Sequence, residues 1–232
     1  MTDMPVEKNS EAPEGETLVK SRQRVSDFGE VFTPSWMVED MLNLVKDETA
    51  RIDSRFLEPA CGSGFFLTSL LRRKLTTVQH KHGKNEFEKR HYAILAIMCI
   101  YGVELQEDNV DECRSNLLGI FDAFFGPSIT EDIHDAAEYV LSQNIICGDA
   151  LSMRTLKTDN NSIEEAITFP EWGYLGKGKF QRRDFRFDAL TQMSAFSEED
   201  TLFADMGRHE VFKPVKVYPQ VTIPELGLKL NE

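Results

Sequence analysis

The sequence predicts an α/β fold built on a mostly parallel sheet. Three observations support this: short apolar runs end at glycine or acidic residues, amphipathic helices separate them, and the two kinds of segment alternate between about residues 34 and 150. Strands that are separated by helices are usually joined by right-handed crossovers, so this alternation is typical of a parallel sheet. The expected order is helix, strand, helix, helix, strand, helix, helix, strand.

The first helix and the first strand flank a glycine-rich turn. Apolar residues recur at helical spacing from Pro34 to Val45, and Thr33 is the candidate cap because Pro34 suits the first helical turn. The apolar run Phe56–Ala60 leads into Gly62-Ser63-Gly64. This pattern indicates a buried strand that feeds a tight turn.

The same pattern continues to residue 150. Strands are predicted at Tyr101–Leu105 and at Asn144–Ala150, because both are short apolar runs that end in an acidic or small residue. Glycine, proline and scattered charge dominate after residue 150, and no helix longer than two turns is expected there. Amphipathic spacing predicts helices from Leu67 to a stop near Gly83, from a cap at Asn85 to Ile100, over Asp108–Phe125 and over Glu131–Gln143.

Three regions follow from this pattern. Residues 1–23 are polar and acidic and are expected to form a disordered leader. Residues 24–152 form the α/β region, and residues 153–232 are expected to be an irregular C-terminal region that completes the sheet. No apolar run approaches the roughly 20 residues that a membrane-spanning helix needs, so no membrane contact is expected.

The charge and the cysteines restrict the classes of function. The net charge is −13, which is the wrong sign for a protein that holds DNA by attraction over its whole surface. Any nucleic-acid contact would need a local basic patch or a basic partner. The four cysteines form no CxxC pair, so they are expected to be reduced thiols in a cytoplasmic protein and not zinc ligands.

Three chemical features lie at the ends of the three predicted strands. Ligands bind at the carboxyl ends of the strands in open α/β sheets. Gly62 and Gly64 let the backbone approach a ligand, Glu104 can accept hydrogen bonds from a ribose diol, and Asp149 can accept one from an exocyclic amino group. Each feature also has a structural alternative: a plain turn, a solvated strand end for Glu104, and a helix cap for Asp149.

Two segments make a specific resemblance. Gly29-Glu30-Val31-Phe32-Thr33-Pro34, followed by EPACGSGFFL from Glu58 to Leu67, closely resembles the opening of N6-adenine DNA methyltransferases. The similarity is to the modification subunits of type I restriction systems and to the fused type IIG enzymes, and it covers about residues 24–152. Gly148-Asp149-Ala150 matches a further motif of that family.

The resemblance implies a Rossmann-like fold that binds S-adenosylmethionine. Its C-terminal half would be reduced, since the 83 residues after Asp149 leave little room for the family's remaining strands and target-recognition region. It implies that the cofactor is bound by Phe32, Thr33, Glu58, Ala60, Gly62, Ser63, Gly64, Phe66, Glu104, Leu105, Asp149 and Ala150.

The family's catalytic tetrapeptide, (N/D)-P-P-(Y/F), does not occur in the sequence. Its place by family spacing falls on Met193-Ser194-Ala195-Phe196, which leaves Ser194 and Phe196 as the catalytic candidates. Phe169-Pro170-Glu171-Trp172 has a proline, a carboxylate and an aromatic ring in another order and is the alternative. The sequence therefore predicts cofactor binding more clearly than autonomous methyl transfer.

One basic stretch is interleaved with aromatic residues. Such a pattern can bind phosphates and stack on bases, which makes it the candidate nucleic-acid contact. The alternative is a solvated hairpin whose aromatic residues pack on the core. The basic residues are Lys177, Lys179, Arg182, Arg183 and Arg186.

The function expected from the resemblance is a DNA adenine-N6 methyltransferase of a restriction-modification or phage-defence system. DNA and a target-recognition or restriction subunit are the expected partners. One alternative is a catalytically inactive scaffold subunit that binds the cofactor and needs a partner chain. Another is a methyltransferase that acts on protein or RNA.

Overall fold

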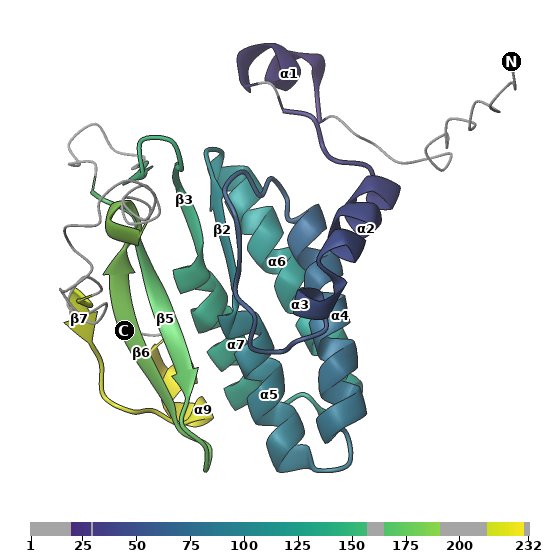
Figure 1. The fold of residues 1–232 in the computed structure, drawn as a ribbon, viewed down its shortest axis with the longest axis vertical. Helices are drawn as coiled ribbons and strands as arrows, with labels where there is room; N and C mark the ends of the chain where they lie inside the picture. The colour runs from purple at the N-terminus through teal and green to yellow at the C-terminus, as the bar shows by residue number, and fades with distance from the viewer. Residues whose placement is uncertain (1–19, 29, 157–164, 191–212, 230–232) are drawn as a thin grey trace, which may run out of the picture.

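The computed structural model describes residues 20–28, 30–156, 165–190 and 213–229 (Figure 1). Within these residues, a four-stranded sheet lies beside a group of helices, and a three-stranded antiparallel sheet lies on the other side. The prediction of an α/β fold with a mostly parallel sheet is confirmed. The arrangement is compatible with a methyltransferase fold, while its Rossmann-like details stay a prediction.

The first sheet has the order β1-β2-β3-β4. Strands β1 (Phe56–Glu58), β2 (Ile100–Glu104) and β3 (Ile145–Asp149) are parallel, and β4 (Arg154–Thr155) is antiparallel to β3. Each predicted strand is present with bounds within two residues of the expected ones. The carboxyl ends of β1 and β2 therefore lie next to each other, as the sequence predicts.

The helices largely match the predicted spans. Asn85 caps its helix as predicted, because its side chain accepts a hydrogen bond from the Glu88 backbone N–H at 3.2 Å. The bounds are α1 (Arg22–Phe28), α2 (Ser35–Leu44), α3 (Lys46–Thr49), α4 (Phe65–His82), α5 (Glu86–Met98), α6 (Glu107–Phe125), η1 (Gly126–Ser128), α7 (Glu131–Asn144) and α9 (Ile223–Leu228).

Two expectations at the N-terminal side are corrected. Pro34, not Thr33, occupies the cap position of α2, and no side chain there accepts a capping hydrogen bond. The predicted leader extended to residue 23, but α1 already begins at Arg22. Residues 1–19 lie outside the described part of the chain. Among the described helices, none is long and apolar enough to cross a membrane.

Strand β2 packs on both of its faces because successive side chains point to opposite sides of a strand. Ile100 belongs to the large apolar core that the helices form, while Tyr101 and Val103 belong to a smaller cluster on the other face. That second cluster is completed by Phe169 and Phe187 from the C-terminal region. The helices thus cover one face of the sheet, and the C-terminal region covers part of the other.

The C-terminal region differs from the expectation. Within its described residues, it adds only the short strand β4 to the first sheet, while β5 (Thr168–Tyr174), β6 (Phe180–Arg186) and β7 (Lys216–Val217) form a separate antiparallel sheet. The period-two signal is weak because the buried positions of β5 are not strictly alternate and because charged residues interrupt β6. The hairpin of the alternative hypothesis is present, and its rings Phe169, Phe180 and Phe187 pack in the core, but Arg182 is largely buried and not solvated.

Candidate functional site

The loop after β1 depends on two glycines. Gly62 and Gly64 have φ values of 52° and 90°, a region that side chains disfavour. A Cβ at Gly64 would lie 2.7 Å from the Cys113 Sγ, and one at Gly62 would lie 3.3 Å from the Phe32 ring. The loop can follow this path because both positions lack a side chain. The absence of a Cβ at Gly62 also leaves the loop backbone uncovered on the side that faces Phe32.

Glu104 ends β2 and joins this loop to the start of α6. Its carboxylate accepts hydrogen bonds from the backbone N–H of Gly62 at 2.9 Å and from that of Gln106 at 3.0 Å. The Asn109 side-chain amide lies 3.4 Å from the same carboxylate. The glycine turn and the acidic strand end, which are 42 residues apart in the sequence, thus meet in one place.

A cavity of about 250 Å³ lies at this place. Among the described residues that line it, the charged ones are three carboxylates, Glu30, Glu58 and Glu104. A concave site with one sign of charge concentrates ligands of the opposite sign, so this cavity favours a cation. The remaining lining residues are Val31, Phe32, Thr33, Met41, Ala60, Cys61, Gly62, Phe65, Phe66, Leu105, Gln106 and Asn109.

The environment of the cavity changes the pKa of Glu58. Burial raises the pKa of Glu58 above its ordinary value, and a hydrogen bond from the Ala60 backbone N–H opposes that shift in part. The negative charge of Glu58 is therefore poorly solvated when the cavity holds no cation. A positively charged ligand would relieve this cost.

Residues 20–28 and 30–33 are tied to the start of α6 by charged and polar contacts. Arg24 pairs with Glu30 and with Asp108, where one guanidinium nitrogen lies 2.7 Å from the carboxylate. Asn109 donates to Glu30 at 3.2 Å and accepts from Lys20 at 2.6 Å. These contacts hold Glu30, and with it the segment that contains Phe32 and Thr33, against the cavity.

The sequence model of one family, N-6 DNA Methylase, matches residues 16–205. The match covers most of the chain and includes every residue that lines the cavity. This chain belongs to the N-6 DNA methylase family. No curated protein and no solved structure matches the chain.

The site of this N-6 DNA methylase family member contains most of the predicted cofactor residues. The cavity is lined by all of them except Ser63, Gly64, Asp149 and Ala150. Gly64 does not line the cavity. It precedes the first residue of α4, and its lack of a side chain lets α4 begin in contact with Cys113. Ser63 is buried, and its backbone carbonyl accepts a hydrogen bond from the Asn116 side chain at 3.0 Å.

Asp149 does not line the cavity, although it ends β3 as predicted. Its carboxylate accepts a hydrogen bond from the Leu151 backbone N–H at 2.9 Å, and this bond lowers the pKa of Asp149. The bond is local, as in the alternative interpretation of Asp149, but it lies in the turn between β3 and β4 and caps no helix. The contact of Asp149 with an adenine ring stays a prediction.

Several lining residues were not predicted. Glu30 belongs to the quoted Gly29–Pro34 segment, but its charge was given no role. Asn109 lies five residues after Glu104, in the first turns of α6, and 1% of its surface is exposed. A buried amide near an acidic strand end is the signal that could have identified Asn109. Its contact with Glu30, however, joins residues 79 positions apart and is not a sequence pattern.

The catalytic residues of this N-6 DNA methylase family member stay unassigned. Ser194 and Phe196 lie outside the described residues. The alternative tetrapeptide, Phe169–Trp172, lies within β5. Only 2% of Trp172 is exposed, and its indole nitrogen donates to the Asn144 side chain at 2.9 Å, so the ring is not available to stack on a base.

The basic stretch makes internal ion pairs. Arg182 contacts Asp184 at 2.6 Å and also donates to Tyr139 and Gln143, so it holds β6 against α7. Arg183 and Arg186 pair with Glu171 and Asp188, respectively. Lys177 and Lys179 are exposed in and beside the hairpin turn. Contact of these five basic residues with nucleic acid stays a prediction.

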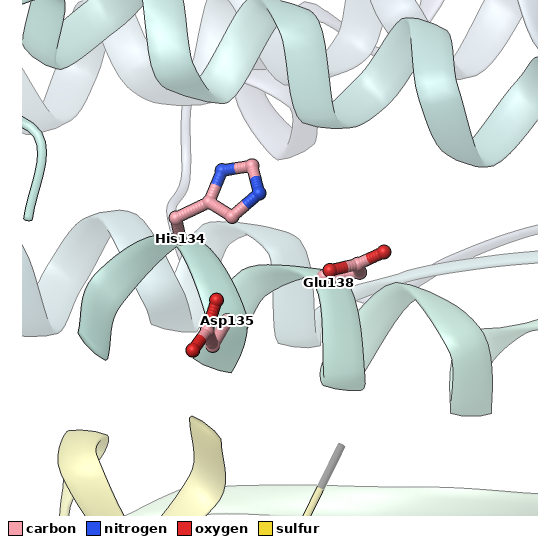
Figure 2. Close-up of side chains that lie close together, drawn as sticks. All are labelled: His134, Asp135 and Glu138. Atoms are coloured by element: carbon pink, nitrogen blue, oxygen red, sulfur yellow. The ribbon is translucent and has the colours of Figure 1, made fainter. Parts of the chain in front are cut away.

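Within the described part of the chain, one group of potential metal ligands lies on α7. Figure 2 shows His134, Asp135 and Glu138 on neighbouring turns of this single helix. Their ligand atoms lie within 4.8 Å of one another, but the His134 Nδ1 is already 3.0 Å from the Asp122 carboxylate. This hydrogen bond raises the pKa of His134. An ion pair between neighbouring helices accounts for the arrangement without a metal.

Proposed function

We propose that this chain binds S-adenosylmethionine as part of a DNA adenine-N6 methyltransferase of a restriction-modification or phage-defence system. Membership of the N-6 DNA methylase family makes the chain a DNA N6-adenine methyltransferase-like protein. One observation carries the proposal of cofactor binding. The Phe32–Thr33 segment, the glycine loop and Glu104 line a single cavity, and Glu104 bonds directly to Gly62.

The chemistry of the cavity fits this cofactor. S-adenosylmethionine has a cationic sulfonium and an ammonium group, and Glu30, Glu58 and Glu104 supply the opposite charge. Glu104 would accept hydrogen bonds from the ribose hydroxyls, as carboxylates at the ends of second strands do in dinucleotide sites. The rings of Phe32 and Phe65, whose centroids are 5.7 Å apart, offer apolar surface for the methionine chain or the adenine ring.

The size of the cavity predicts a rearrangement on binding. About 250 Å³ lies below the roughly 300–1,000 Å³ of most small-molecule sites. Without a ligand, Glu104 accepts a hydrogen bond from the Gly62 N–H, and this contact holds the glycine loop close to the end of β2. Ribose hydroxyls would replace that bond, so we expect the Gly62 amide to change its environment when the cofactor enters.

The bound cofactor would supply an electrophilic methyl group, which moves from the sulfonium sulfur to the adenine N6 while the sulfur becomes a neutral thioether and N6 loses a proton. The adenine amino nitrogen is a poor nucleophile and must be oriented by hydrogen-bond acceptors. The family tetrapeptide that does this is absent from the sequence. Transfer by this chain therefore requires other acceptors, from its own residues or from a partner chain, and without them the chain is an inactive cofactor-binding subunit.

Calorimetric titration of the purified chain with S-adenosylmethionine tests the proposal. We expect saturable binding that Glu104→Ala weakens by about 1–3 kcal/mol, because the substitution removes the acceptor for buried donors. That range corresponds to roughly 5- to 150-fold in Kd. Glu107→Ala, which removes a neighbouring exposed carboxylate outside the cavity, should leave Kd unchanged. Absence of binding at millimolar cofactor would refute the proposal.

A transfer assay separates the enzyme from the inactive subunit. The chain is incubated with methyl-labelled S-adenosylmethionine and duplex DNA that contains all adenine sequence contexts, and the nucleosides are then separated. Label in N6-methyladenine excludes an inactive subunit. Label in RNA or protein, offered in parallel reactions, and none in DNA would instead favour a different acceptor.

A further inference from the structure

The two carboxylate oxygens of Glu104 have different partners. The Oε1 atom accepts a hydrogen bond from the Gln106 backbone N–H at 3.0 Å and lies 3.4 Å from the Asn109 side-chain nitrogen, so both of its donors belong to the start of α6. The Oε2 atom accepts a hydrogen bond from the Gly62 N–H at 2.9 Å, and within the described residues it has no other donor. Helix α6 therefore holds Oε1, while Oε2 can exchange the glycine loop for a ligand.

The Asn109 amide lies between two carboxylates of the cavity. Only 1% of Asn109 is exposed, and a buried amide needs partners for both its NH2 group and its oxygen. The NH2 group donates to the Glu30 carboxylate at 3.2 Å and to the Glu104 carboxylate at 3.4 Å. The oxygen accepts a hydrogen bond from the Lys20 ammonium at 2.6 Å. Asn109 thus connects a cation with two carboxylates that line the cavity.

Lys20 determines which way the Asn109 amide points. A side-chain amide can rotate by about 180° and exchange the positions of its oxygen and its nitrogen, because the two groups have nearly the same shape. An ammonium group has hydrogen-bond donors and no acceptor, so the amide must present its oxygen to Lys20. The opposite orientation would place that oxygen against Glu30 and Glu104. The ammonium of Lys20 therefore keeps the NH2 group directed at the two carboxylates.

Lys20 is itself held on α6 by acidic side chains. Its ammonium lies 2.5 Å from the Glu112 carboxylate and 3.5 Å from that of Asp108. Burial lowers the pKa of Lys20, but the hydrogen bond to Glu112 and the charges of both carboxylates raise it by more, so the pKa lies above its ordinary value. Lys20 does not line the cavity, and its contact with the residues that do is made through Asn109.

We propose that Asn109 and Lys20 are positioning residues of the candidate cofactor site. Lys20 orients the Asn109 amide, Asn109 holds the Oε1 atom of Glu104, and the Oε2 atom is thereby directed at the hydroxyl groups of a ribose. The ligand class is a nucleoside that retains both ribose hydroxyls. Its identification as S-adenosylmethionine rests on the proposed function, whereas the contacts that connect Lys20 to Glu104 do not depend on that function.

Ligands with and without the ribose hydroxyls test the proposal. The affinities of the native chain, Lys20→Met and Asn109→Leu for S-adenosylmethionine and for its 2′,3′-dideoxy analogue are measured by ligand-observed NMR, which detects weak binding. We expect each substitution to raise the Kd for S-adenosylmethionine about three- to tenfold, the effect of one hydrogen bond, and to leave that for the analogue unchanged. Lys46→Met is the matched control, because Lys46 is exposed on α3 and does not line the cavity.

A second measurement follows the Asn109 amide in the free chain. In the native chain we expect its side-chain protons, assigned by their loss in Asn109→Leu, to exchange slowly with water, because the group is buried and bonded to carboxylates. Lys20→Met should accelerate this exchange about fivefold or more, since the amide can then rotate. Lys20→Arg keeps a cation that has donors only, so it should restore both the slow exchange and the affinity for S-adenosylmethionine.

Equal losses of affinity for S-adenosylmethionine and its analogue would overturn the proposal, because they would indicate a general distortion of the cavity. Native exchange of the Asn109 amide in Lys20→Met would overturn it as well. Adenosine and 2′,3′-dideoxyadenosine, titrated in parallel, separate this proposal from the proposed function. Binding of adenosine without S-adenosylmethionine would refute only the proposed function, and cofactor binding that neither substitution changes would refute only the positioning roles. Absence of binding by both nucleosides would refute both proposals.

Discussion

At the scale of single residues, the candidate site combines features that lower stability with features that favour a ligand. Glu58 is a half-buried carboxylate with a raised pKa, and it lines one small cavity together with Glu30 and Glu104. Perturbed groups of this kind are concentrated at functional sites. A bound cation would offset the loss of stability that comes from placing three carboxylates in one cavity.

The raised pKa of Glu58 predicts that ionisation of this side chain lowers the stability of the folded chain as the pH rises. The folded chain binds the Glu58 proton more tightly than the unfolded chain, whose pKa is near 4.5. The contribution of Glu58 to stability therefore falls as the pH rises from about 4.5 through the folded pKa. We expect Glu58→Gln to increase the free energy of unfolding at pH 7, to have little effect near pH 4, and to weaken S-adenosylmethionine binding at pH 7.

Urea denaturation at pH 4 and 7 and calorimetry at pH 7 measure these effects. Glu107→Gln is the matched control, because Glu107 is exposed next to the site and does not line the cavity. Equal stability of Glu58→Gln and the native chain at pH 7, with unchanged affinity, would show that the burial of Glu58 has no functional consequence.

Substitution of Gly64 and of Gly119 by alanine should change the free energy of unfolding in opposite directions. Gly64→Ala would place a Cβ at a φ of 90° and 2.7 Å from the Cys113 Sγ. We expect a loss of about 1–3 kcal/mol from backbone strain alone, with a further loss from the clash. Gly119→Ala adds a methyl group on α6 with nothing within 4 Å and should stabilise by about 0.5–1 kcal/mol. Chemical denaturation of both variants checks the prediction, and similar effects would contradict it.

At the scale of elements, α4 fixes the approach to β1 through a buried lysine. The Lys74 ammonium donates to the backbone carbonyls of Arg51, Ile52 and Ser54 at 2.6–3.1 Å. Burial lowers the pKa of Lys74 to about 8, so the group is still largely charged at neutral pH. The turn that leads into β1 is therefore held by a side chain of the helix that follows β1.

We expect Lys74→Met to lower the free energy of unfolding by about 1–3 kcal/mol, since it leaves buried carbonyls without a donor. Lys81→Met is the matched control on the same helix, because Lys81 is exposed. Urea denaturation measures both. A Lys74→Met variant as stable as the control would show that water or a rearranged backbone replaces the ammonium.

At the scale of the whole molecule, the charge distribution predicts weak binding to DNA by the isolated chain. The net charge is −13, and three of the five basic residues in the candidate stretch already pair with carboxylates. In fluorescence anisotropy with a 30-base-pair duplex at physiological salt, we expect no saturation below roughly 100 µM, the weak limit of nonspecific binding.

Saturable binding near 1 µM would contradict this prediction and would mean that a local surface overcomes the net charge. The double variant Lys177→Ala, Lys179→Ala would then identify that surface, because both side chains are exposed at the hairpin turn. Loss of binding in the double variant would support the candidate stretch, while unchanged binding would place the contact elsewhere.

The sequence alone determined those features that depend on neighbouring residues. The alternation of helices and strands, the Asn85 cap and the tight turn at Gly62 and Gly64 follow from periodicity and backbone preference, which act over a few residues. The place of Glu104 at the edge of the cavity also follows from the sequence, because the end of a second parallel strand has a defined position in such a sheet, while its contact with a ribose stays a prediction.

The tertiary structure alone decided which polar residues meet. Asn109 joins Glu30 to Glu104, whereas Asp149 bonds to Leu151 and does not line the cavity. Arg182 holds a hairpin against α7, although it belongs to the stretch that is the candidate nucleic-acid contact. The contacts of Asn109 with Glu30 and of Arg182 with Tyr139 join residues 79 and 43 positions apart, so they form only when the chain has folded.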